Sequence, residues 1–140
     1  MHRYHWLLLC SAWLVATLAT AGALFIGEVM LMTPCVLCWY QRIFMFPIAL
    51  VLTLACLRGD RQGAVYALAL AIGGALTAAI HLLLLAGWID TASLPCQSGV
   101  SCADQKLEIL GGLPIPGLSL LAFLLILAAL TPLFLRKTAR

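Results

Sequence analysis

Four long stretches of this chain contain no Asp, Glu, Lys or Arg, and they limit its fold more than any other feature. They cover residues 6–26, 43–57, 64–89 and 113–135. A helix of about 20 apolar residues spans a bilayer, and 64% of the residues are hydrophobic while only 9% are charged. A soluble globule of 140 residues has too little interior to bury so much apolar surface. The composition therefore predicts an integral membrane protein and excludes disordered, collagen-like and nucleic-acid-binding chains.

The pattern predicts an all-α four-helix bundle that forms a single membrane domain over residues 1–140. We expect spans near residues 6–26, 41–57, 64–88 and 114–135. The second stretch is the shortest, and it reaches bilayer length if its helix begins at Val36 and includes Arg42. A charged side chain inside a span is costly and is usually functional, even where it reaches toward the headgroups. Arg42 is therefore a candidate functional residue.

The basic residues are distributed unevenly between the two sides of the predicted bundle. Six of the eight lie before the first span, between the second and third, or after the fourth: Arg3, Arg58, Arg61, Arg136, Lys137 and Arg140. Cytoplasmic loops retain Lys and Arg during membrane insertion. We therefore expect both termini in the cytoplasm and two extracytoplasmic loops, near residues 27–40 and 89–113.

The six cysteines fall into two groups under this topology. Cys10 and Cys56 lie in spans near the cytoplasmic side, where we interpret them as inert buried thiols. The other four lie on the extracytoplasmic side, two in each loop: Cys35, Cys38, Cys96 and Cys102. Two disulfides can form there if the compartment is oxidising.

The first pair is a C-x-x-C motif, Cys35 to Cys38, placed where the second helix is expected to begin. Thr33 is suited to cap this helix and Pro34 to occupy its first position. The helix dipole and the free amide groups of a first turn stabilise a thiolate, and Arg42 follows Cys38 by one turn on the same face. A disulfide across so short a loop stabilises little, so we interpret the pair as redox-active.

The second pair, Cys96 and Cys102, lies in a loop with Ser and Gly residues and no apolar core of its own. A bond between these two cysteines would be accessible to another protein. Taken alone, the pair is equally compatible with a structural disulfide and with an exchanging one. Because both pairs lie on one side of the membrane, thiolate attack on a disulfide can pass electrons between them.

A metal site is the main structural alternative for these cysteines. A C-x-x-C motif can supply half of a zinc site, but the spacing of Cys96 and Cys102 is atypical for the other half. His81 would be a reserve ligand. We therefore assign no metal, and the alternative function is a non-enzymatic membrane protein with structural disulfides or bound metal.

An outward dithiol that is reduced repeatedly needs an electron acceptor. The chain has no haem-binding C-x-x-C-H motif and no glycine-rich dinucleotide fingerprint, and its polar loops are too small to house a flavin. A lipid-soluble acceptor is the simplest remaining choice. Four aromatic residues are candidates for its ring pocket, although an interfacial aromatic belt explains each of them more simply: Trp39, Tyr40, Phe44 and Phe46.

The run LMTPCVLCWYQR, residues 31–42, resembles the P-C-x-L-C-x-x-x-R block of the DsbB family of membrane thiol oxidases. The likeness extends to four spans, two outer cysteine pairs and the GLPIP run at 112–116, and the short second loop is similar to the BdbC branch. This resemblance implies a protein of the bacterial cytoplasmic (inner) membrane, with redox loops facing the periplasm or exterior. It implies reoxidation of a soluble DsbA-like thioredoxin-fold oxidase and electron transfer to a membrane quinone, ubiquinone or menaquinone.

The resemblance also implies a role for each outer cysteine. Cys96 matches the cysteine that forms a mixed disulfide with the soluble partner. Cys102 matches the cysteine that pairs with Cys96 and exchanges with Cys35. Cys38 matches the cysteine whose thiolate donates electrons to the quinone.

Two residues are implied at the quinone site besides Cys38. Arg42 matches an arginine that supports quinone binding, and His81 on the third span resembles a quinone-side histidine of some members. Gln41 stands where an acidic residue often precedes the arginine, which leaves Arg42 less neutralised. A vitamin K epoxide reductase-like quinone reductase is the alternative enzyme, but its redox pair lies near the end of a late helix.

Overall fold

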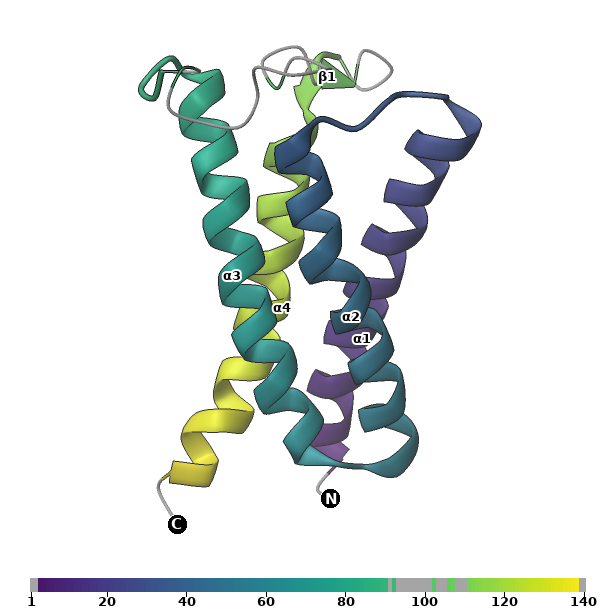
Figure 1. The fold of residues 1–140 in the computed structure, drawn as a ribbon. Helices are drawn as coiled ribbons and strands as arrows, with labels where there is room; N and C mark the ends of the chain where they lie inside the picture. Colours follow the sequence, from purple (N-terminus) through teal and green to yellow (C-terminus); the bar gives the residue numbers. More distant parts are fainter. Residues whose placement is uncertain (1–2, 91, 93–101, 103–105, 108–110, 139–140) are drawn as a thin grey trace.

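The computed structural model describes residues 3–90, 92, 102, 106–107 and 111–138 as a bundle of long helices that run alternately up and down (Figure 1). The four long helices are α1 (Arg3–Leu24), α2 (Val36–Arg58), α3 (Arg61–Leu85) and α4 (Ile115–Thr138). Each of them is long and apolar enough to cross a membrane. The predicted four-helix membrane bundle is therefore confirmed.

The segments that join the helices gather at the two ends of the bundle (Figure 1). At one end, a π-helical turn, η1 (Phe25–Val29), continues α1. The same end carries two short strands that pair antiparallel, β1 (Lys106–Leu107) and β2 (Leu113–Pro114). Both chain termini and the connection from α2 to α3 lie at the opposite end. Both cysteine-containing connections thus share one end of the bundle.

Cys35 caps α2, which corrects the expected cap at Thr33 and the expected first helical position at Pro34. Cys35 has an extended backbone with ψ 171°, and its Sγ accepts a hydrogen bond from the backbone N–H of Cys38 at 3.4 Å. The sulfur thus satisfies one of the free amide groups of the first turn, as a capping oxygen usually does. The helix therefore begins at Val36, and Arg42 lies in its second turn.

Small residues on α3 allow this helix to pack closely against its neighbours. Ala71, Gly74 and Ala78 are buried at helical spacing, and His81 continues the same buried face. A Cβ atom on Gly74 would lie 2.2 Å from the ring of Phe123 on α4. Glycine is therefore required at this crossing.

Two polar contacts join α1 to α2 toward the end that holds the termini. Trp13 Nε1 donates to Thr53 Oγ1 at 2.8 Å, and the Sγ atoms of Cys10 and Cys56 lie 3.5 Å apart. At a rise of 1.5 Å per residue, about 30 Å of helix separates Cys56 from Cys35. These two thiols therefore form a separate pair that takes no part in the site at the other end.

Candidate redox site

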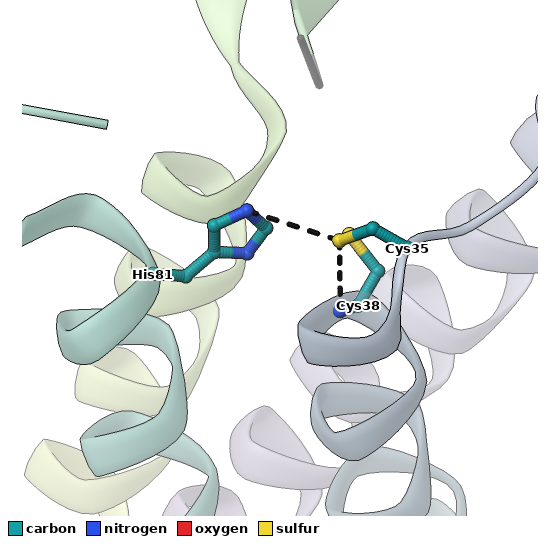
Figure 2. A group of neighbouring side chains, drawn as sticks. All are labelled: Cys35, Cys38 and His81. Atoms are coloured by element: carbon teal, nitrogen blue, oxygen red, sulfur yellow. Dashed lines mark hydrogen bonds between the residues drawn. The ribbon is translucent and has the colours of Figure 1, made fainter. Parts of the chain in front are cut away.

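Cys35 and Cys38 lie together at the first turn of α2, and both are buried thiols that are not disulfide-bonded (Figure 2). Their Sγ atoms are 3.2 Å apart. Capping explains this separation, because Cys35 turns its sulfur back over the amide of Cys38. A disulfide needs sulfurs about 2.05 Å apart, so only a small movement accompanies the loss of two electrons and two protons that turns the dithiol into the disulfide.

The surroundings of Cys35, which precedes the membrane-spanning helix, favour its thiolate. The hydrogen bond with the Cys38 thiol is the largest influence, and burial opposes it. His81 and the backbone amide of Cys38 stabilise the anion further, so the pKa of Cys35 falls to about 4. Because the thiolate is the nucleophile in disulfide exchange, Cys35 is ready to react at neutral pH.

His81 projects from α3 toward the first pair and is fully buried (Figure 2). Its Nε2 lies 2.9 Å from the carbonyl oxygen of Cys102 and 3.9 Å from Sγ of Cys35. Its Nδ1 lies 3.0 Å from Nε2 of Gln41. A carbonyl only accepts, so Nε2 carries the ring hydrogen and Nδ1 accepts from the Gln41 amide. This arrangement places the His81 N–H beside both Cys102 and Cys35.

Cys102 joins the first pair in one buried cluster with Leu37 and Leu84. Its side chain is 1% exposed and is disulfide-bonded. Cys96, the other cysteine predicted for this loop, lies outside the described residues. The structure thus brings together three of the four predicted redox cysteines, with the first pair reduced and Cys102 oxidised.

A cavity of about 240 Å³ lies between α1, α2 and α4. Most of its lining is apolar, and polar side chains come from Cys38, Gln41, Arg42 and Ser119. Neither Cys35 nor His81 is among the described residues that line it. A concave apolar site with a few convergent polar groups is the usual form of a small-molecule site.

Arg42 brings a permanent positive charge to this cavity. Its Nη2 donates to the carbonyl oxygen of Ala23 at 2.8 Å, and its guanidinium carbon lies 5.7 Å from the centroid of the Trp39 ring. These contacts hold the guanidinium in place without neutralising it. Cys38 lines the same cavity, so a thiol and a fixed cation border one space.

The aromatic side chain in the cavity wall is Phe123 of α4, beside Ser119, and no local sequence feature indicated either residue. The four aromatic residues considered for a ring pocket are not among the described lining residues. Trp39 and Tyr40 are exposed on the outside of the bundle. An interfacial belt is therefore the better interpretation for these two residues.

Comparison with protein families matches residues 2–133 to the family described as disulfide bond formation protein DsbB. A probable disulfide formation protein of Metapseudomonas resinovorans is 47% identical, over 95% of this chain and 92% of the relative. Disulfide bond formation protein C of Bacillus subtilis (strain 168) is 40% identical, over 85% of this chain and 86% of the relative. Probable disulfide formation protein C 2 of Bacillus cereus is 35% identical, over 91% of this chain and 88% of the relative. No solved structure matches the chain.

Proposed function

Because this chain belongs to the DsbB family of disulfide bond formation proteins, we propose that it reoxidises a soluble DsbA-like dithiol oxidase and passes the electrons to a membrane quinone. Family membership and the four spanning helices make it a multi-pass membrane oxidoreductase that forms disulfides. One observation carries the finer proposal. The first cysteine pair borders the cavity through Cys38 and shares a buried cluster with Cys102.

The two outer pairs act in sequence in this proposal. A disulfide between Cys96 and Cys102 accepts two electrons and two protons from the reduced partner, whose own cysteines become a disulfide. The resulting outer dithiol then attacks a Cys35–Cys38 disulfide, which re-forms the outer disulfide and leaves the first pair reduced. The disulfide-bonded Cys102 and the reduced thiols of Cys35 and Cys38 correspond to the state after this exchange.

His81 supports exchange between the pairs rather than a contact with the cavity. Its Nε2–H faces both the carbonyl of Cys102 and the sulfur of Cys35. We therefore assign to His81 the positioning of Cys102 beside the first pair. The same N–H stabilises the thiolate that forms on Cys35.

The cavity residues fit a quinone, because the walls are apolar and the polar groups gather near Cys38. When bound there, a quinone supplies an acceptor for two electrons and two protons. Cys38 is the sulfur at the cavity wall, and the first pair becomes a disulfide as it gives up those electrons and protons. Arg42 lines the cavity, and its guanidinium would stabilise negative charge that develops on a quinone oxygen there.

The proposed orientation follows from the basic residues. Arg58 and Arg61 lie in or beside the connection between α2 and α3, at the same end as both termini. The positive-inside rule supports a cytoplasmic location for that end. The redox site then faces the periplasm or exterior from the bacterial cytoplasmic membrane, where a secreted thioredoxin-fold partner has access.

The test of this function uses purified full-length protein, a reduced DsbA-like oxidase, and ubiquinone or menaquinone in detergent. We expect one partner disulfide to form for each quinone reduced. Neither product should appear when protein or quinone is left out. Partner oxidation that continues without quinone consumption would exclude the proposed acceptor, and no oxidation at all would favour a structural role for the disulfides.

Replacing Arg42 with alanine should raise the KM for quinone by about 10- to 100-fold. A hydrogen bond to a charged group contributes about 1.5–3 kcal/mol, and each 1.4 kcal/mol corresponds to tenfold in affinity. The KM for the soluble partner should stay unchanged, because Arg42 faces the cavity. Arg58→Ala is the matched control, since Arg58 lies exposed at the far end of the same helix. Equal quinone KM values in the two variants would remove the proposed role of Arg42.

The reduced protein should show thiolate absorbance that rises as the pH passes through about 4, because the pKa of Cys35 is lowered to that value. The ordinary thiol pKa is 9.0. Since the folded pKa is the lower one, the thiolate contributes to stability fully above pH 9.0 and loses that contribution as the pH falls toward 4. Titration of the ultraviolet absorbance measures the transition, and Cys35→Ser should remove it. A first transition near pH 9 in the parent protein would contradict the assignment.

A further inference from the structure

The reduced first pair and His81 present three metal-ligand atoms to one point (Figure 2). The sulfurs of Cys35 and Cys38 and a ring nitrogen of His81 all lie within 4.8 Å of one another, and all three residues are buried. The two sulfurs are 3.2 Å apart, and Sγ of Cys35 is 3.9 Å from Nε2 of His81. Thiolate and imidazole are the ligands that zinc prefers.

These separations are close to those of a bound zinc ion. Tetrahedral zinc with bonds of about 2.3 Å to sulfur and about 2.0 Å to nitrogen holds two sulfurs about 3.8 Å apart and a sulfur about 3.5 Å from the nitrogen. The two distances in the protein lie within about 0.6 Å of this geometry. Small side-chain movements on α2 and α3 therefore complete a three-ligand site, with the fourth position left for water.

We propose that reduced Cys35 and Cys38, together with His81, form a binding site for a thiophilic divalent cation of the zinc class. Binding displaces the remaining thiol protons and moves no electrons. Oxidation of the pair removes two electrons and two protons, forms the disulfide and eliminates two of the three ligands. The site therefore exists in only one half of the redox cycle, and an ion bound there blocks thiol exchange.

Gln41 supplies the support that a metal-bound imidazole needs. Without metal, its amide donates to Nδ1 of His81 while Nε2–H faces the carbonyl of Cys102. Metal binding through Nε2 moves the ring hydrogen to Nδ1, and a rotated Gln41 amide then accepts it through its oxygen. The Cys102 carbonyl loses its donor in this state. Metal binding and docking of Cys102 on His81 are therefore mutually exclusive.

This ligand set differs from the zinc site considered from the sequence, which required Cys96 and Cys102 as its second half. Cys102 is disulfide-bonded, while Cys35 and Cys38 are reduced thiols. His81 takes the place of the second pair because α3 packs beside the start of α2. Cys38 lines the cavity, which gives an ion a route to the buried sulfurs. The proposal does not depend on whether the electron acceptor is a quinone.

The test uses the full chain with the other four cysteines replaced by alanine: Cys10, Cys56, Cys96 and Cys102. Cys35 and Cys38 are then the only thiols in the chain. Zn²⁺ is titrated into the reduced protein by calorimetry, and Co²⁺ reports thiolate ligation through its charge-transfer absorption. We expect one ion per chain in the reduced protein and none after the pair has been oxidised to a disulfide.

His81→Ala and Gln41→Ala separate this site from simple chelation by two thiols. We expect both variants to weaken Zn²⁺ binding by at least about tenfold, because loss of a supporting partner alone costs about 10- to 100-fold in metal affinity. If His81→Ala fails to fold, Gln41→Ala decides the question alone. Unchanged affinity in the folded variants, or equal binding by the oxidised protein, would overturn the proposal. So would metal binding that appears only when Cys96 and Cys102 are restored.

Discussion

Replacing Cys38 with serine should abolish quinone reduction and leave the folded bundle intact. Cys38 is the sulfur of the first pair that lines the cavity, and a serine hydroxyl cannot form a disulfide with Cys35. Cys35 alone cannot close to a disulfide within the pair, so the variant cannot deliver two electrons to the cavity. Turnover with the reduced partner and quinone should therefore fall to the uncatalysed rate, as measured by quinone absorbance.

The same variant should accumulate a mixed disulfide between Cys35 and the outer pair, because Cys38 is no longer available to resolve it. Peptide mass spectrometry after acid trapping identifies that bond. Cys56→Ser is the matched control, since Cys56 lies in the same helix and contacts Cys10 at the other end. It should retain full turnover. If Cys38→Ser also turned over at the parental rate, the proposed electron path through the cavity would be wrong.

The bundle was predictable from the sequence because each span can be recognised from its own residues, by its bilayer length and its lack of charged side chains. α2 begins at Val36, before the boundary expected near residue 41. That earlier start is the one that bilayer length requires when Arg42 lies inside the span. The cap was not predictable. Thr33 has the better intrinsic preference for capping, but the sulfur of Cys35 lies over the amide of Cys38 and takes that role.

The site was predictable only where its residues follow one another along a single helix. Cys38 and Arg42 are one turn apart on α2, so their spacing alone places both on one face of the helix, and in the structure that face borders the cavity. The contacts of His81 with Gln41 and with Cys102 depend instead on how helices and loops pack. Phe123 enters the cavity wall for the same reason, and nothing in its local sequence distinguishes it from other apolar residues of α4.

Replacing Gly74 with leucine should prevent α3 from packing on α4 and should cause loss of the folded protein. A Cβ atom at this position would lie 2.2 Å from the ring of Phe123. That ring is fully buried between the helices, so it can give way only by moving into the cavity that it lines. The smaller change Gly74→Ala should reduce the free energy of unfolding by about 1–3 kcal/mol. Thermal unfolding in detergent measures both effects.

The packing at Gly74 also determines where His81 lies, because the two residues share one buried face of α3 and are two turns apart. Gly22→Ala is the matched control, since a Cβ atom there meets nothing within 4 Å; it should leave stability unchanged or slightly raised. In the double variant Gly74→Ala/Phe123→Leu, the smaller leucine side chain replaces the opposing ring and should recover part of the lost stability. A double-mutant cycle measures the coupling between the two positions. Parental stability in Gly74→Leu would show that α3 and α4 do not meet at this crossing, and the position of His81 beside Cys35 would then lose its structural basis.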